Sequence, residues 1–183
     1  MNNMNALNAK RYSGGKTARL FLGIFMCAAL PLFLTRDASF AGTPKLVRSA
    51  PAFEVRTLEG KRFGLREARG RPVVINFWAS WCTPCRTEAQ GIQRAYAAFK
   101  GAGVRFIGIA VDDEPKNARR FIKEFNWSFP VSLDAADEMI RAYNVYGVPK
   151  TVVVNGDGLI THEHLGPISE ETLTQEIKNA LPR

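Results

Sequence analysis

The stretch NFWASWCTPCRTE, residues 76–88, constrains the fold more than any other part of the sequence. It places Cys82 and Cys85 three positions apart, directly after an apolar run. That run, VVINFW at residues 73–78, has the β-branched and aromatic content of a buried strand. A helix is expected over about residues 84–99 because apolar side chains recur there at spacings of three and four. A strand that leads through a cysteine pair into a helix predicts an α/β fold with the pair at the junction.

The remaining segments alternate between strand and helix patterns, which predicts a mixed sheet flanked by helices. The lead-in at residues 42–50 should be flexible. Beyond it we expect two short strands about a turn near Glu59–Gly60 and a buried strand over 104–111. A helix should start at DDEP and run into Trp127, followed by a short strand at 130–134 and a helical stretch at 138–145. The chain should end with a strand hairpin over 151–165 and a final helix over 168–181. The first crossover should make the two long strands parallel neighbours.

The first 41 residues have the features of a targeting segment. LFLGIFMCAALPLFL, residues 20–34, has no charge in fifteen residues, which is shorter than the roughly 20 residues that span a bilayer. Ser39 and Ala41 supply the small side chains that precede a cleavage site. We therefore expect residues 1–41 to be a signal peptide cut after Ala41, with an uncleaved N-terminal membrane anchor as the alternative. Residues 42–183 would then form one domain in the periplasm, or anchored at the membrane surface that faces it.

The net charge of +8 does not indicate a nucleic-acid partner. Residues 1–41 hold five basic residues and one acidic residue, so half of the net charge lies in the expected leader. The charges of the remaining chain are interleaved, as in RTLEGKRFGLREARGR, which is typical of a solvated surface. We expect no nucleic-acid binding.

Cysteine usage favours redox chemistry. Cys27 lies in the leader and is interpreted as an apolar filler, so the domain keeps only Cys82 and Cys85. A structural disulfide would gain little from so small a loop. Zinc needs about four ligands, and a composite site would have to recruit His162 and His164, which share one strand face. Exposed strand polarity is the simpler interpretation of the two histidines. We expect no metal and no cofactor.

The position of Cys82 explains how it could react. At the start of a helix, unpaired backbone N–H groups and the helix dipole stabilise a thiolate, and Arg86 adds to this if it points toward the sulfur. Cys85, within bridging reach and deeper, would then attack the mixed disulfide that Cys82 forms with a partner. Trp81 is either an aromatic contact surface for that partner or a packed turn residue.

These motifs together resemble the thioredoxin superfamily. WCTPC follows an apolar strand, and GVP, residues 147–149, precedes a later one. Within the superfamily, residues 50–181 resemble the exported TlpA/ResA/CcmG-type thiol–disulfide oxidoreductases, which share the leading PAFEVRTLEGKRF segment and a helix/strand segment inserted before the proline. The resemblance implies that Pro149 is cis and faces the dithiol. It also implies that Val148 presents its backbone to a substrate strand by β-augmentation.

The resemblance further implies roles for two polar residues. Asn76 stands where ordinary thioredoxin has a buried acid, and it cannot take up a proton. Glu88, a helix neighbour of Cys85, matches an acid that serves proton transfer to and from the buried thiol. The alternative is a solvated helix glutamate.

The function implied is reduction of protein disulfides in an oxidising compartment. Substrates would be apocytochrome c haem-attachment motifs or copper-site assembly proteins, and a membrane thiol reductant would supply electrons. Two alternatives remain. Cys82 and Cys85 could hold Cu(I) in a chaperone module, because soft thiolates suit that ion. A thiol peroxidase shares the fold, but WCTPC fits it poorly.

Overall fold

The structure is a computed structural model that describes residues 48–133 and 137–182. All of them belong to the unit Gly42–Arg183. The leader expected over residues 1–41 lies outside the described residues. Within the part of the chain that is described, no helix combines the length and apolarity that crossing a bilayer requires.

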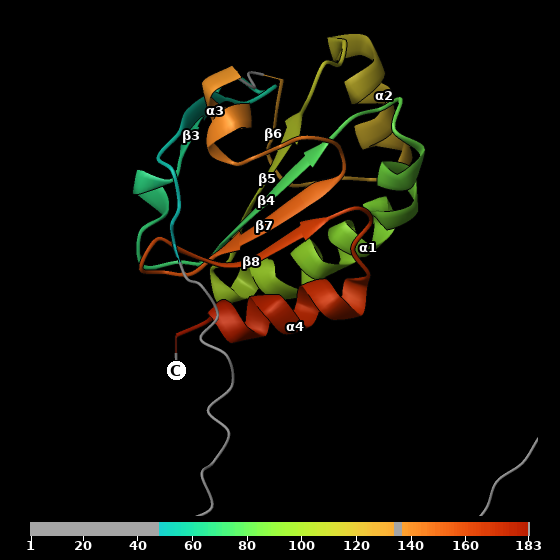
Figure 1. The fold of residues 1–183 in the computed structure, drawn as a ribbon. Helices are drawn as coiled ribbons and strands as arrows, with labels where there is room; N and C mark the ends of the chain where they lie inside the picture. The colour runs from blue at the N-terminus through green and yellow to red at the C-terminus, as the bar shows by residue number, and fades with distance from the viewer. Residues whose placement is uncertain (1–47, 134–136, 183) are drawn as a thin grey trace, which may run out of the picture. The chain divides into compact units, whose positions relative to one another are not determined.

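The described unit is built around a six-stranded mixed sheet with the strand order β1-β8-β7-β4-β5-β6 (Figure 1). Strands β4 and β5 pair in parallel, whereas β7 pairs antiparallel with both β4 and β8. A separate hairpin joins β2 to β3. The strand bounds are β1 Arg48–Ser49, β2 Glu54–Arg56, β3 Arg62–Gly64, β4 Val73–Trp78, β5 Arg105–Ala110, β6 Val131–Ser132, β7 Lys150–Val154 and β8 Leu159–Leu165. The predicted mixed sheet, its parallel pair of long strands, its β7–β8 hairpin and the separate β2–β3 hairpin are confirmed.

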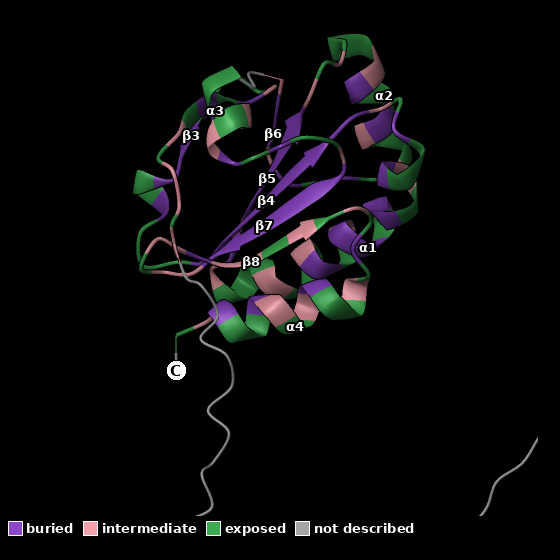
Figure 2. Ribbon diagram, in the orientation of Figure 1, coloured by how far each residue is buried: buried purple, intermediate pink, exposed green. Residues whose placement is uncertain are grey.

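The helices also follow the predicted order. They are α1 Thr83–Phe99, α2 Pro115–Glu124, α3 Asp137–Ala142 and α4 Glu170–Ala180, with 3-10 turns η1 Arg66–Ala68 and η2 Lys100–Ala102. One face of the sheet packs against α1, α2 and α4, and the other against α3, η1 and the β2–β3 hairpin (Figure 1). Figure 2 shows β4, β5 and β7 buried between these two layers. The strands β4, β5 and β7 are mostly apolar because both faces of the sheet are covered, although β4 and β7 also bury Asn76 and Thr151.

Two expectations for local structure were wrong. The lead-in does not stay irregular through residue 50, because Arg48 and Ser49 form β1 and pair with the start of β8. This places β1 at the end of the sheet where β4 begins. The second helix ends at Glu124, short of Trp127, because Asn126 adopts a left-handed φ of 52° that a right-handed helix cannot continue. The DDEP start is confirmed, since α2 begins at Pro115.

Candidate active site

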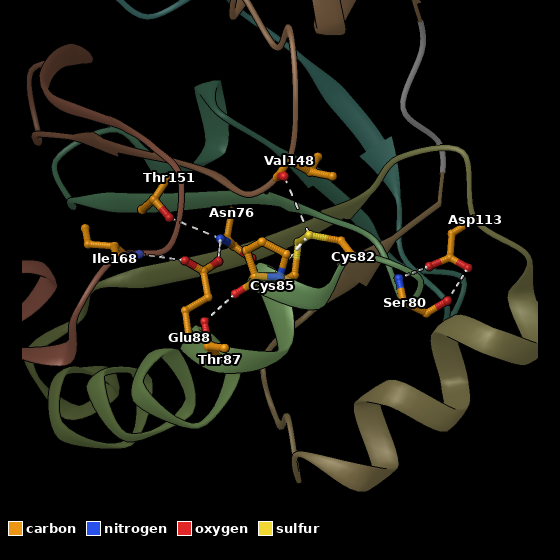
Figure 3. The surroundings of a disulfide bond; sticks show 11 residues. Asn76, Ser80, Cys82, Cys85, Thr87, Glu88, Asp113, Val148, Thr151 and Ile168 are labelled. Carbon is orange, nitrogen blue, oxygen red and sulfur yellow. Dashed lines mark hydrogen bonds between the residues drawn. A yellow bond between two sulfur atoms is a disulfide. The ribbon is translucent and has the colours of Figure 1, made fainter.

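The cysteine pair lies where β4 gives way to α1, as predicted. Cys82 is the N-cap residue of α1, and its sulfur accepts a hydrogen bond of 3.2 Å from the backbone N–H of Cys85. The two cysteines are joined by a disulfide (Figure 3). Cys82 is 4% exposed and Cys85 is 1% exposed, so Cys85 is the deeper of the two. A thiolate released at Cys82 would meet the unpaired N–H groups of the first helical turn.

The segment before β7 brings a second element against the dithiol. The Val148–Pro149 peptide bond is cis, which confirms the expected geometry. The carbonyl oxygen of Val148 lies 3.5 Å from the Cys82 sulfur, from the opposite side to Cys85 (Figure 3). The oxidised sulfur carries no hydrogen, so this is a contact; in the reduced form the Cys82 thiol can donate to the same oxygen.

Glu88 is buried one turn along α1 from Cys85, with 4% of its surface exposed. The interpretation as a solvated helix glutamate is therefore wrong. Its Oε1 accepts a hydrogen bond of 2.9 Å from Asn76 Nδ2, and its Oε2 accepts one of 2.8 Å from the backbone N–H of Ile168 (Figure 3). Burial raises the pKa of Glu88 to about 7, while the Ile168 and Asn76 hydrogen bonds act in the opposite direction. The carboxyl group can therefore change protonation state near neutral pH.

The loop that precedes Cys82 is fastened to the end of β5. Asp113 accepts hydrogen bonds from the Ser80 backbone N–H at 2.5 Å and from the Ser80 hydroxyl at 2.8 Å (Figure 3). Trp81 donates its indole N–H to the Asp112 carbonyl at 3.0 Å, yet 62% of its surface is exposed. The exposed indole does not fit a packed turn residue, and it offers an apolar surface next to the disulfide.

The AhpC/TSA family matches residues 47–163, which is more than half of the chain. The chain belongs to the AhpC/TSA family. The chain is also 30% identical over 166 residues to the thiol-disulfide oxidoreductase ResA of Bacillus thuringiensis, covering 90% of this chain and 95% of that relative.

Two solved structures support the same assignment for this AhpC/TSA-family chain. A thioredoxin-family thiol:disulfide interchange protein from Chlorobium tepidum superposes with a TM-score of 0.67 at 31% identity, covering 73% of this chain and 96% of that one. A secreted Mycobacterium tuberculosis disulfide oxidoreductase homologous to E. coli DsbE superposes with a TM-score of 0.63 at 29% identity, covering 69% and 95%. The expected thioredoxin-like fold is confirmed, and the chain is a thiol–disulfide oxidoreductase with a Cys82–Cys85 pair.

Arg86 does not point toward the sulfur of this AhpC/TSA-family oxidoreductase. Its guanidinium forms an ion pair with Glu124 and lies 5.1 Å from the ring centre of Phe125 and 5.6 Å from that of Phe121. The condition under which Arg86 would add to the stabilisation of the Cys82 thiolate is therefore not met. The helix start itself remains as the source of that stabilisation.

The two histidines lie on one strand, β8, and their rings face each other. The rings of His162 and His164 stack with centroids 6.0 Å apart, and His162 Nδ1 lies 3.6 Å from Glu176 Oε1. Among residues 48–133 and 137–182, no cluster of three or more histidine, cysteine or acidic side chains is arranged to hold a metal ion.

Three site residues escaped prediction. Thr151 Oγ1 accepts a hydrogen bond of 3.1 Å from Asn76 Nδ2, which depends on the register between β4 and β7. Ile168 acts through its backbone N–H, a group that every residue except proline supplies. The DDEP motif predicts that Asp113 lies at the start of a helix, but its contact with Ser80 depends on the parallel pairing of β4 with β5.

Proposed function

We propose that the chain is an exported thiol–disulfide reductase of the periplasm. Its substrates would be proteins with disulfides that form during cytochrome c maturation or copper-site assembly, and a membrane thiol reductant would return it to the dithiol form. Cys82, Cys85 and Glu88 would be the catalytic residues, and Trp81, Val148 and Pro149 would contact the substrate. The observation that carries the proposal is the buried Glu88 carboxyl group one helical turn from Cys85.

Glu88 supports reduction rather than oxidation for an electrostatic reason. Strongly oxidising dithiol proteins owe that property to a stabilised reduced form, which contains a thiolate. An ionised carboxyl group near Cys85 opposes a second negative charge there and favours the protonated thiol. Arg86 faces Glu124 and the Phe125 ring instead of the dithiol, so it does not offset this effect. The reduced form is thereby less stabilised, which makes it a better electron donor.

The proposed reaction uses the three catalytic residues in sequence. The Cys82 thiolate attacks one sulfur of the substrate disulfide, and the other substrate sulfur leaves as a thiolate. Glu88, ionised, accepts the proton of the Cys85 thiol. Cys85 then attacks Cys82, forms the intramolecular disulfide and releases the second substrate sulfur. Two electrons pass to the substrate, whose thiolates take protons from solvent. A reductant dithiol reverses these steps on the oxidised protein, and protonated Glu88 returns its proton to Cys85.

The contacts around Cys82 support the assignment of the substrate-binding residues. Val148 places a backbone carbonyl 3.5 Å from the reacting sulfur, where an extended substrate segment could pair by β-augmentation. The indole of Trp81 is exposed next to Cys82 and would cover the apolar side chains of that segment.

Export is supported by the leader-like residues 1–41 and by the similarity to a secreted disulfide oxidoreductase. The domain would begin near Gly42 if the leader is cleaved after Ala41. An uncleaved leader would instead anchor the domain at the inner membrane.

A trapping experiment tests the function. Cys85→Ser removes the thiol that resolves the mixed disulfide, so a substrate that has reacted with Cys82 stays attached. The full chain with this change is expressed in its native compartment, and attached proteins are identified by mass spectrometry. We expect apocytochromes c or copper-assembly proteins.

The control chain carries both Cys82→Ser and Cys85→Ser, so any protein captured through Cys27 appears in both samples. Capture of a broad set of newly exported proteins would indicate a disulfide-forming oxidant and contradict the proposal. Equal capture by the single and double variants would contradict a reacting Cys82.

A further inference from the structure

A buried hydrogen-bonded cluster connects the sheet to Glu88. Asn76 on β4 and Thr151 on β7 are direct register partners, and both are buried on the side of the sheet from which Glu88 of α1 approaches. Asn76 Nδ2 lies 2.9 Å from Glu88 Oε1 and 3.1 Å from Thr151 Oγ1 (Figure 3). Both hydrogens of the Asn76 amide nitrogen are therefore used, which fixes the amide plane between its two partners.

The cluster gives each carboxylate oxygen of Glu88 one donor. Asn76 serves Oε1, and the Ile168 backbone serves Oε2. Donors of this kind stabilise an ionised carboxyl group that would otherwise be strongly disfavoured away from water. Asn76 is 1% exposed and Thr151 is 0% exposed, so water cannot easily replace them.

The same residues also suit the protonated carboxyl group. An asparagine amide carries both a donor nitrogen and an acceptor oxygen, and a threonine hydroxyl can donate or accept. Within the described residues, Asn76 Oδ1 is buried without a hydrogen-bond partner. If the Asn76 amide rotated by half a turn, Oδ1 would take the place of Nδ2. It could then accept a hydrogen bond from the protonated Glu88 carboxyl group and another from the Thr151 hydroxyl. An aspartate at position 76 would add a second charge instead.

We propose that Asn76 and Thr151 are positioning residues that hold the Glu88 carboxyl group and keep it hydrogen-bonded in both its ionised and its protonated form during exchange. This inference rests on the proposed role of Glu88 as the proton acceptor and donor for Cys85. Asn76 and Thr151 would thereby allow Glu88 both to accept a proton from Cys85 and to return it inside the core.

The test measures how fast dithiothreitol reduces the oxidised protein between pH 5 and 9, followed by tryptophan fluorescence. Each rate is divided by the rate of the Glu88→Gln protein at the same pH, so the titration of the reagent cancels. For the unchanged protein this quotient should fall near pH 7, where Glu88 loses the proton that it gives to Cys85. Asn76→Leu removes a donor to the carboxylate, so the fall should move upward by about one pH unit.

Thr151→Val provides an isosteric variant in case Asn76→Leu folds poorly. It should shift the midpoint upward by less, and Thr151→Ser, which keeps the hydroxyl, should restore it. Thr161→Val is the matched control, because the Thr161 hydroxyl donates to Val153 on the neighbouring strand and not to the cluster. It should leave the midpoint unchanged.

The outcomes separate the two proposals. A flat quotient for the unchanged protein would overturn the role of Glu88. A fall near pH 7 that stays at the same pH in both Asn76→Leu and Thr151→Val would overturn the role of Asn76 and Thr151 alone.

Discussion

Glu88 shows how a single residue can link folding to the redox site. Its carboxyl group lies in the core, where it accepts hydrogen bonds from the Asn76 amide and the Ile168 backbone N–H. Burial removes the charged form from water more strongly than these two donors compensate. The buried carboxyl group therefore lowers the stability of the fold at neutral pH, which fits its proposed role in proton transfer.

This cost predicts a pH dependence of stability. Burial raises the Glu88 pKa from 4.5 to about 7, so between these values the folded protein holds a proton that the unfolded chain has released. The free energy of unfolding should then fall as the pH rises through this window, by about 3 kcal/mol in total. Urea unfolding of the oxidised protein at pH 4.5 and pH 8, compared with Glu88→Gln at the same pH values, measures the contribution.

The Glu88→Gln comparison removes the contributions of all other titrating groups. The difference in stability between the two proteins should change in favour of the glutamine variant as the pH rises. If the difference in unfolding free energy between the two proteins stayed constant from pH 4.5 to pH 8, Glu88 would have its ordinary pKa and would be accessible to water.

Among the elements, the β5–α2 junction supports the loop that carries the reactive cysteine. Asp113 accepts two hydrogen bonds from Ser80 and a third, of 2.9 Å, from the backbone N–H of Glu114. The side chain thus connects the start of α2 to the residues just before α1. This connection holds Trp81 close to Asp112, whose carbonyl receives the indole N–H.

Removing this connection should loosen the loop without unfolding the domain. Asp113→Ala leaves the Ser80 groups without their acceptor, which should lower the free energy of unfolding by about 2 kcal/mol. The emission of Trp81 should shift to longer wavelength as the indole loses its bond. Differential scanning calorimetry and fluorescence check both effects. Asp157→Ala, in the exposed β7–β8 turn, is the control and should change neither the unfolding free energy nor the emission. An equal loss of stability in Asp157→Ala would contradict a specific role for Asp113.

Elements with strong local patterns were predictable, and contacts between elements were not. The apolar spacing of α1 and the β-branched run of β4 placed Cys82 correctly at their junction. The direction of Arg86 depended on α2 packing alongside α1, which no local pattern encodes. The burial of Glu88 likewise depended on the segment at Ile168, 80 residues away. Helical spacing correctly predicted that Glu88 neighbours Cys85, but it could not predict which residues bury the Glu88 carboxyl group.

At the scale of the whole molecule, an aromatic cluster joins α2 to the sheet. The Phe121 ring centre lies 4.4 Å from that of Trp78 and 5.2 Å from that of Trp127. The indole N–H of Trp127 donates to the Ala89 carbonyl of α1 at 2.8 Å. The sequence indicated these residues as apolar, but their mutual contacts follow from the placement of three separate elements.

Phe121 should therefore contribute more to stability than Phe125, four residues later. Phe121→Ala leaves a cavity in a fully buried position and should cost about 4 kcal/mol of unfolding free energy. Phe125→Ala removes the half-buried ring of the residue that caps the same helix and should cost about 1 kcal/mol. Guanidinium chloride unfolding of both variants measures the two losses. A larger loss for Phe125→Ala would contradict the cluster as the main support of α2.

The location of β1 has a practical consequence. Arg48 is paired with Ile160, level with the first residue of β4, whereas Cys82 follows the last. Arg48, the first residue that the structure describes, thus lies at the end of the sheet opposite the sulfur atoms. A reporter or surface linker joined directly to residue 48 would leave the domain from that end, which suits immobilised assays in which large client proteins must reach the disulfide unhindered.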